Sequence, residues 1–324
     1  MTLACPACNT PFNDNGTLIK DLRCSNKTCT YYNIPYPIIN NKPVLICPNL
    51  EYSILDTLDQ FSNANNTITG FTGRDVDKKR LLFRQKVQDI FYDFSRVEFK
   101  NYKKLFQMLN RNSRVLIVGG GNIDTSYSSN LEWVQLFREK NINFTVTDIY
   151  LSKNVHFVCD AHYMPFLDSS FDAVIITTVL EHVLSPTIVV GEIYRVLNEN
   201  GLLYATIPFI QCVHEGAYDF TRFTICGQRW LFRYFEEHES GVFVGTSCAY
   251  LYNFTTFISL VSNFKPLGIL IRLFLWRLCA LFDKLMPKTI HINQGMCNYF
   301  IGMKSINQSI KAGEMPDYYK KFIA

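Results

Sequence analysis

The chain has 324 residues, of which 48% are hydrophobic and 19% are charged, and it holds 26 Phe and 18 Tyr. This composition excludes a disordered chain, and the length suffices for about two domains. The net charge of +4 is too small over this length to indicate a nucleic-acid-binding protein. Residues 74–114, however, hold 12 Lys and Arg against 5 Asp and Glu, a net of +7, so the remaining residues sum to −3. This stretch predicts a basic surface.

The 11 cysteines could form disulfides, but the opening MTLACPACNTPF lacks the basic and apolar segments of a secretory signal, which indicates a reducing compartment. We therefore expect a cytoplasmic protein whose cysteines are thiols or metal ligands. No run reaches the ~18 uninterrupted apolar residues that a membrane-spanning helix requires.

Residues 1–48 predict a zinc-binding mini-domain with small strands at 17–19 and 43–46. Two cysteine pairs, Cys5-x-x-Cys8 and Cys24-x4-Cys29, are separated by 15 residues, a spacing that lets two knuckles meet around one tetrahedral Zn(II). Four thiolates leave no open coordination position, so the zinc is predicted to be structural. Cys47 is an alternative ligand, and four unrelated buried cysteines are the alternative interpretation.

Residues 49–112 predict a Ser- and Asn-rich linker followed by two amphipathic helices between 75 and 110, where apolar residues recur every three to four positions. From Arg114 apolar, β-branched runs alternate with helical patterns, which is typical of a parallel sheet covered by helices. The predicted strands lie in RVLIVGGG, NFTVTDI, HFVCD, FDAVIITTVLE and GLLYATIPF, with helices at 131–139 and 187–197. A helix at 224–235 and strands at 241–248 and 296–304 follow.

Three features near predicted strand ends have the chemistry of a nucleotide site. Gly119 to Gly121 form a glycine turn after a buried strand, where backbone N–H groups can approach a ligand. Asp148 ends the next strand, where a carboxylate can accept hydrogen bonds from both hydroxyls of a ribose. Asp160-Ala161 ends the third. A tight turn that binds no ligand is the alternative for the glycines alone.

Two stretches resemble known families. Tyr36-Pro37-Ile38 followed by Lys42-Pro43-Val44-Leu45-Ile46 is similar to the small zinc ribbons that accompany or activate methyltransferases, which implies a platform for a partner or substrate. The block CDAHYMPFLDSSFDAVIITTVLEHV, with EIYRVLNENGLLYATIP, resembles class I S-adenosylmethionine-dependent methyltransferases, specifically the subgroup similar to the quinone-biosynthesis C-methyltransferases.

This resemblance implies an α/β fold, a seven-stranded Rossmann-like methyltransferase sheet with helices on both faces, in residues 113–310. It also implies S-adenosyl-L-methionine as cofactor, with the glycine turn at its methionine end, Asp148 at the ribose and Asp160 with Ala161 at the adenine. The expected cofactor-binding residues are Gly119, Gly120, Gly121, Asp148, Asp160, Ala161 and Leu180. Two positions depart from the family pattern: Ile117 replaces the usual acidic residue, and Ile123 replaces a glycine.

Candidate catalytic residues follow the fourth and fifth predicted strands, where open α/β sheets bind their ligands. His182 is a candidate base, although the Leu-Glu-His run could only stabilise its turn. The loop 213–222 is similar to a His, Asp and Arg loop in methyltransferases of surface-polysaccharide gene clusters, which makes His214 a candidate base and Arg222 a candidate substrate anchor. Alternatively, Asp219 and Arg222 pair and simply fix the shape of the loop.

The hydrophobic stretch 249–289 predicts a helical insertion with a stripe of five charged residues: Lys265, Arg272, Arg277, Asp283 and Lys284. It fits either a membrane interface, or a lid or dimer surface. The sequence thus predicts methyl transfer to a small or lipid-linked acceptor, such as a sugar of a surface polysaccharide, by a protein that is cytoplasmic or peripheral to the membrane. Alternatives are a zinc-ribbon RNA methyltransferase and a non-catalytic binding protein. The ribbon or the insertion could also bind a protein partner or a second copy.

Overall fold

The computed structural model describes residues 2–12, 22–53, 94–121, 139–152 and 154–323. Several expectations from the sequence lie outside these residues: the strand at 17–19, the first of the two amphipathic helices, nearly all of the helix at 131–139, and Ile123.

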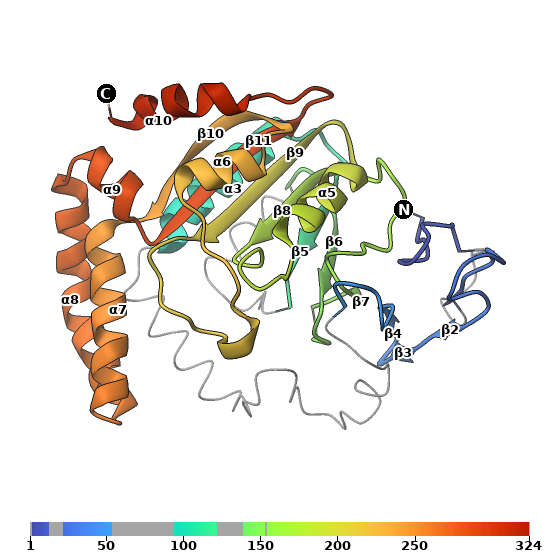
Figure 1. Cartoon of the computed structure of the whole chain (residues 1–324), viewed down its shortest axis with the longest axis horizontal. Helices are drawn as coiled ribbons and strands as arrows, with labels where there is room; N and C mark the ends of the chain where they lie inside the picture. Colours follow the sequence, from blue (N-terminus) through green and yellow to red (C-terminus); the bar gives the residue numbers. More distant parts are fainter. Residues whose placement is uncertain (1, 13–21, 54–93, 122–138, 153, 324) are drawn as a thin grey trace.

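A nine-stranded sheet forms the centre of the molecule (Figure 1), in the order β10-β11-β9-β8-β5-β6-β7-β4-β3. Neighbours from β9 to β4 are parallel, whereas β11 is antiparallel to both β9 and β10. The strands are β3 (Ile38–Ile39), β4 (Lys42–Leu45), β5 (Arg114–Val118), β6 (Asn143–Asp148), β7 (Phe157–Cys159), β8 (Phe171–Thr177), β9 (Leu197–Pro208), β10 (Phe235–Val244) and β11 (Cys297–Lys304). The predicted α/β sheet of seven strands is confirmed, and β3 and β4 extend it.

Helices cover both faces of this sheet because its buried strands are apolar on both sides. Leu116 and Val118 of β5 face a core shared with α5 (Pro186–Val196) and α6 (Ile225–Leu231). The alternate residues Val115 and Ile117 face a second core, which holds Tyr102, Leu105 and Phe106 of α3 (Phe94–Met108). Ile117 therefore packs beneath the sheet as a core residue.

The prediction of a strand at 241–248 was wrong in its bounds, since β10 ends at Val244 and α7 (Thr246–Val261) begins two residues later. The helix predicted at 224–235 likewise ends at Leu231, and Phe235 opens β10. β10 is an edge strand of largely half-exposed residues, so FEEHESGVFV lacks the apolar run that marks the inner strands. The chain ends with η2 (Ala312–Glu314) and α10 (Met315–Ile323).

The hydrophobic insertion is a helical hairpin of α7 and α8 (Lys265–Leu285), closed by the short α9 (Lys288–Gln294). A Cβ at Gly268 would lie 2.1 Å from the Thr255 carbonyl oxygen, so glycine permits the close approach of the two helices. Arg272 turns inward, donates to Thr255 Oγ1 at 3.0 Å and stacks over the Tyr252 ring. Asp283 accepts from the backbone N–H of Ser247 at 2.7 Å.

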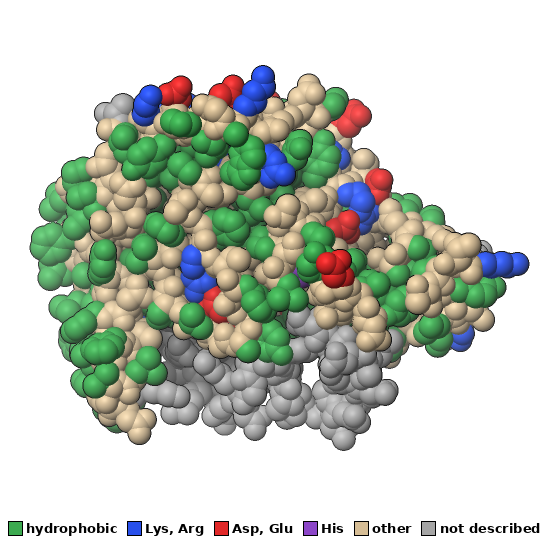
Figure 2. Space-filling model, viewed as in Figure 1, with side chains coloured by type: hydrophobic (Ala, Val, Ile, Leu, Met, Phe, Trp, Pro, Cys, Tyr) green, Lys and Arg blue, Asp and Glu red, His purple; other side chains and the backbone are tan. Residues whose placement is uncertain are grey.

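Two of the five charges on the predicted stripe thus face α7, and the outer surface is more apolar than the sequence indicated. Figure 2 shows hydrophobic side chains gathered over α7 and α8. Among the helices in the described residues, none is long and apolar enough to cross a membrane.

The N-terminal segment is joined to the central sheet. β1 (Leu22–Arg23) pairs with β2 (Pro35–Tyr36) in a separate small ladder, but β4 lies parallel to β7, with Val44 opposite Val158. Leu3 forms a bridge with Phe166, and Ala4 N donates to Pro165 O at 3.0 Å. A domain boundary at residue 48 stays a prediction, and strand pairing crosses it.

Arg195 of α5 joins this segment to the loop after β7, because its Nη1 also donates to Asn9 Oδ1 at 3.3 Å. Its guanidinium donates to Glu192 Oε1 at 2.7 Å, to Asp168 Oδ1 at 2.9 Å and to the carbonyl oxygens of Phe166 and Met164 at 2.6 and 2.9 Å. Its side chain is 22% exposed.

Arg195→Ala should lower the free energy of unfolding by about 2–4 kcal/mol, since a half-buried carboxylate and two carbonyls lose their donor. Urea denaturation measures the loss, with Arg233→Ala as a control that removes a guanidinium stacked on Trp230 and Tyr234. A loss no larger than that of the control would contradict this role.

Candidate functional site

The glycine turn lies at the carboxyl end of β5. Gly119 has φ +75°, a left-handed conformation that favours glycine, and a Cβ there would lie 2.1 Å from Val179 Cγ2. The N–H groups of Gly119 and Gly120 donate to the Thr147 carbonyl at 2.9 and 3.0 Å. The turn is therefore held against the end of β6 and has no room for side chains.

Asp148 closes this turn from the end of β6. Its Oδ2 accepts from Gly121 N at 2.7 Å, and its Oδ1 accepts from Tyr150 N at 2.9 Å. Burial raises the pKa of this carboxyl above its usual range, against these two hydrogen bonds. A Cβ at Gly121 would lie 2.6 Å from Asp148 Oδ2, so the absence of a side chain permits the contact.

Asp160 follows β7 and is 7% exposed. Its Oδ1 accepts from both the backbone N and the ring Nδ1 of His162, at 2.9 and 2.7 Å. The other ring nitrogen, Nε2, accepts from Ser185 N at 3.1 Å, just before α5. Tyr52 stacks on the imidazole with ring centroids 5.3 Å apart. His162 thus positions Asp160, a contact that sequence reasoning missed.

Leu180 and Ala161 belong to the same edge. Leu180 is fully buried and packs in the core on the α5 side, and Ala161 packs against that core. The Leu180 carbonyl accepts from Thr221 Oγ1 at 3.3 Å, which ties the end of β8 to the loop 213–222.

His182 and His214 meet although 32 residues separate them. Their Nε2 atoms lie 3.2 Å apart, and their side chains are 23% and 24% exposed. His182 Nδ1 donates to the Tyr218 carbonyl at 2.6 Å, beside η1 (Gly216–Tyr218). Burial, and then the neighbouring His182, lower the pKa of His214. The predicted candidates therefore form a pair.

Asp219 and Arg222 form an ion pair that fixes the loop. Arg222 Nη2 donates to Asp219 Oδ2 at 2.8 Å, and its Nη1 donates to Oδ1. Asp219 Oδ2 also accepts from His214 N at 2.9 Å. Burial opposes the charge of Asp219, but the hydrogen bonds from Arg222 and His214 outweigh it and lower its pKa to about 2. Arg222 further donates to the Gln211 and Cys212 carbonyls, so its donors mostly serve the loop.

Glu181 is a residue of this site that the sequence did not single out as a ligand or a base. It is fully buried, and neither carboxylate oxygen has a hydrogen-bond partner among the described residues. Burial raises its pKa to about 8. Its Oε1 lies 3.6 Å from His182 Nε2. The Leu-Glu-His run in the sequence contained this residue, but the run was interpreted only as a turn beside His182.

The four paired cysteines converge as predicted. Their sulfur atoms all lie within 4.8 Å of one another, with Cys8 and Cys24 3.5 Å apart and Cys5 and Cys29 3.9 Å apart. Sulfur ligands at about 2.3 Å from a tetrahedral zinc lie roughly 3.8 Å apart, so the arrangement fits one Zn(II). Cys47 lies outside this group, and the Tyr36 hydroxyl links it to Cys5 at 3.1 and 3.3 Å. Cys47 is thus an outer neighbour of the cluster.

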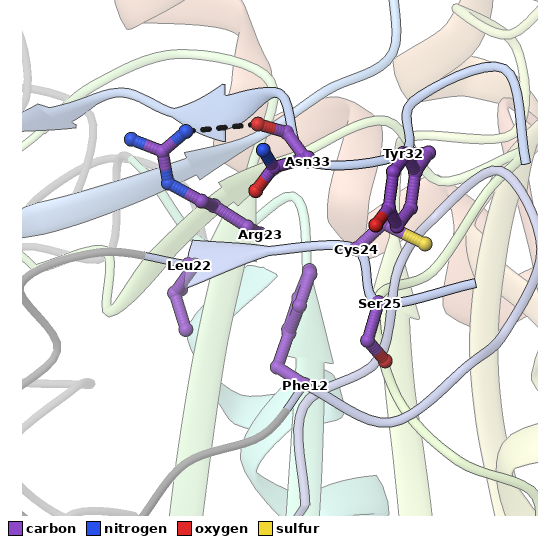
Figure 3. A pocket seen from close by; sticks show the side chains of 7 residues that line it. All are labelled: Phe12, Leu22, Arg23, Cys24, Ser25, Tyr32 and Asn33. Carbon is purple, nitrogen blue, oxygen red and sulfur yellow. Dashed lines mark hydrogen bonds between the residues drawn. The ribbon is translucent and has the colours of Figure 1, made fainter. Parts of the chain in front are cut away.

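A pocket of about 290 Å³ lies beside this cluster (Figure 3), away from the glycine turn. Phe12, Leu22 and Tyr32 line it together with Arg23, whose Nη1 donates to the Asn33 carbonyl at 2.8 Å. Cys24 is the one predicted site residue in its wall. All of its lining residues belong to the N-terminal segment, so the pocket is separate from the residues predicted to bind the cofactor.

Residues 129–205, which end within β9, match the family model of a methyltransferase domain. Over these residues the chain is similar to methyltransferases. None of the curated proteins matches the chain.

Several solved methyltransferase structures are similar to it. A candidate sarcosine dimethylglycine methyltransferase from Galdieria sulphuraria is 14% identical with a TM-score of 0.42, over 64% of this chain and 84% of that one. The Haloferax volcanii complex of the Trm112 methyltransferase activator with a candidate methyltransferase is 15% identical with a TM-score of 0.39, over 69% of this chain and 94% of that one. Phosphoethanolamine N-methyltransferase 2 of Haemonchus contortus, bound to S-adenosyl-L-methionine, is 17% identical with a TM-score of 0.39, over 64% of this chain and 52% of that one.

Proposed function

We propose that this protein transfers the methyl group of S-adenosylmethionine to a small or lipid-linked acceptor, such as a sugar of a surface polysaccharide. The observation that supports this most is the tight turn at Gly119–Gly121. The N–H group of Gly121 donates to the carboxylate of Asp148, which ends the neighbouring strand. A dinucleotide-type sheet with an inserted antiparallel β11 surrounds it.

The residues at this edge fit the cofactor. Gly119, Gly120 and Gly121 leave backbone surface for its methionine end, Asp148 would accept from the ribose hydroxyls, and Asp160 with Ala161 and Leu180 would flank the adenine. Ile117 cannot supply the usual carboxylate for the methionine amine, because its side chain lies in the core on the α3 side. The amine must therefore be bound by other groups.

The histidine pair would serve the acceptor. Methyl transfer from a sulfonium is an in-line displacement, so the protein mainly positions the two reactants and removes the proton of the acceptor. His214, whose pKa is lowered, is suited to accept that proton, with His182 beside it. The Asp219–Arg222 pair holds His214 through its backbone. The N–H donors of Arg222 are all bound by carbonyls of the loop and by Asp219, which favours a role in fixing the loop over one in anchoring the acceptor.

Calorimetric titration with S-adenosylmethionine and S-adenosylhomocysteine tests the first part of this proposal. We expect both to bind, and we expect transfer of a labelled methyl group to lipid-linked or soluble glycan acceptors. Failure of both to bind at millimolar concentration would instead support the non-catalytic binding protein.

His214→Ala should lower kcat about 10²- to 10⁴-fold, because a general base contributes about this factor. The Kd for S-adenosylmethionine should stay within about twofold of wild type. His238→Ala removes an exposed histidine outside the site and serves as the control. Unchanged turnover in His214→Ala on an identified acceptor would refute the assignment.

The α7–α8 hairpin supports a lipid-linked acceptor, because its outer surface combines exposed apolar side chains with cations. Phe274 is 82% and Leu285 75% exposed, and Arg277 and Lys284 lie among them. Such a helix can lie in the interface of an anionic membrane. A lid or a dimer surface is the competing use of this face.

Co-sedimentation with vesicles of anionic phospholipid should be lost in the double variant Phe274→Glu, Leu278→Glu, since each glutamate removes apolar contact and adds repulsion. Ile306→Glu replaces a residue that is 84% exposed outside the hairpin, and it should bind as wild type does. No binding by the wild type would end the membrane proposal, and concentration-dependent dimers would then favour the second copy.

The RNA methyltransferase remains the runner-up on the basic charge of residues 74–114. Residues 74–93 of that stretch lie outside the described residues. A steep loss of RNA binding with rising salt would favour this alternative, because neutralised phosphates release counterions. A protein partner for the N-terminal ribbon would be detected as a stable complex with a fixed stoichiometry.

A further inference from the structure

Glu181, His182 and His214 place three metal-ligating atoms together at the acceptor side of the sheet. A carboxylate oxygen and two ring nitrogens lie within 4.8 Å of one another. They come from the end of β8 and from the loop after β9, so the tertiary fold alone brings them together.

The distances between these atoms match a coordination sphere. Two nitrogen ligands at about 2.1 Å from a metal ion lie roughly 3.0–3.4 Å apart for bond angles between about 90° and about 110°. The two Nε2 atoms are 3.2 Å apart. Glu181 Oε1 is 3.6 Å from His182 Nε2, and all three ligand atoms lie within 4.8 Å of one another.

The outer partner of His182 matches such a site, whereas His214 Nδ1 has a carboxylate nearby but no hydrogen-bond partner among the described residues. Metal-binding histidines usually donate their second ring N–H to a carbonyl or carboxylate, which leaves the other nitrogen free to coordinate. His182 Nδ1 donates to the Tyr218 carbonyl, and His214 Nδ1 lies 3.2 Å from Asp219 Oδ2. Both Nε2 atoms therefore face the centre.

Glu181 provides an independent observation. Its side chain is fully buried, and both of its oxygens lack hydrogen-bond partners among the described residues. A buried carboxylate without partners is costly unless a cation compensates it. Arg222 is the nearby cation, but its guanidinium is bound on both sides to Asp219. The cluster thus contains a carboxylate that lacks a direct partner at the position where a metal ion would sit.

We propose that Glu181, His182 and His214 bind a divalent transition-metal ion beside the acceptor pocket, with Asp219 and the Tyr218 carbonyl as its outer partners. Two imidazoles and one carboxylate favour Zn(II), Fe(II) or Co(II) over Mg(II), which prefers oxygen ligands. Three protein ligands leave coordination positions open for an acceptor that presents hydroxyl oxygens.

The role of the metal rests on the proposed methyl transfer, whereas the site itself does not. With the ion bound, His214 is a metal ligand and no longer the base. Coordination instead lowers the pKa of the acceptor hydroxyl, which loses its proton to water near neutral pH. Its oxygen then bonds to the methyl carbon as the carbon–sulfur bond of S-adenosylmethionine breaks, and S-adenosylhomocysteine leaves. A single base would need only His214. A metal site also explains why His182 and the buried Glu181 lie beside it.

Cobalt titration of the full-length protein tests the site without cofactor or acceptor. The metal-free protein is first loaded with a single equivalent of zinc, which the four thiolates bind in preference, so that the proposed second site stays open. We expect it to bind one further equivalent of Co(II) without a thiolate-to-cobalt charge-transfer band, because no sulfur coordinates this ion. A charge-transfer band would instead report exchange at the cysteines and would count against the second site.

His214→Ala and Glu181→Gln should each weaken this binding at least 100-fold, and Asp219→Asn about 10- to 100-fold. His238→Ala is the matched control and should bind as wild type does. Circular dichroism and the zinc content of the cysteine cluster establish that each variant is folded, and His214→Ala decides the result if Glu181→Gln does not fold. Absence of the extra equivalent in wild type, or unchanged affinity in His214→Ala, would overturn the proposal. Cobalt binding without S-adenosylmethionine binding would leave the metal site intact and refute only the methyl transfer.

Discussion

Cys24→Ser should lower the melting temperature of the whole chain by roughly 10 °C and abolish zinc binding by the N-terminal segment. Structural zinc contributes on the order of 10 kcal/mol to the folding of small domains. If only about 3 kcal/mol of this reaches the central sheet, at ~2–4 °C per kcal/mol the shift is of this size. Loss of zinc should destabilise the central sheet directly, because β4 of the zinc-binding segment pairs with β7.

Zinc analysis and differential scanning calorimetry measure both effects. Cys226→Ser is the matched control, since Cys226 is a half-buried free thiol outside the cluster. Chelation of zinc from the wild type should reproduce the Cys24→Ser shift. Equal melting temperatures for Cys24→Ser and Cys226→Ser would show that the four cysteines are not a structural metal site.

Asp148→Ala should raise the Kd for S-adenosylmethionine about 30- to 1000-fold. A carboxylate that accepts hydrogen bonds from two ribose hydroxyls contributes about 2–4 kcal/mol to binding, and each 1.4 kcal/mol is tenfold. The variant also removes the acceptor for Gly121 N–H, so Asp148→Asn, which retains a carbonyl oxygen, should weaken binding less.

Isothermal titration calorimetry gives these constants, and Asp317→Asn, at an exposed aspartate of α10, controls for the loss of one negative charge. An unchanged Kd in Asp148→Ala would contradict the ribose assignment. Wild-type binding with equal weakening in all three variants would point to a general charge effect.

Local patterns in the sequence predicted most of the sheet. The inner strands are continuous apolar runs with turn residues between them, so β5, β8 and β9 were evident without any tertiary information. The paired cysteines were equally clear, because their spacing is itself the geometric requirement. The prediction erred at β10, an edge strand whose half-exposed residues carry no such run.

The candidate site was predicted residue by residue, but its assembly was not. His182 and His214 were each singled out, whereas their contact depends on how the loop 213–222 folds back over the end of β8. Glu181 and His162 were missed because the importance of each lies in burial and partners that adjacent residues do not encode. Arg272 was placed on the charged stripe of the insertion, and only the hairpin geometry turns it toward Tyr252.

The pairing of β4 with β7 also sets the order in which the molecule can be completed. β7 has three residues and would otherwise be an exposed edge strand, which is a template for aggregation. Its cover, β4, is synthesised more than a hundred residues earlier and pairs with β3 on its other side, so during translation one edge of β4 stays unpaired until β7 emerges. Metal loading in that interval would keep β4 in its final conformation, and zinc-starved cells should accumulate the newly made chain as aggregates.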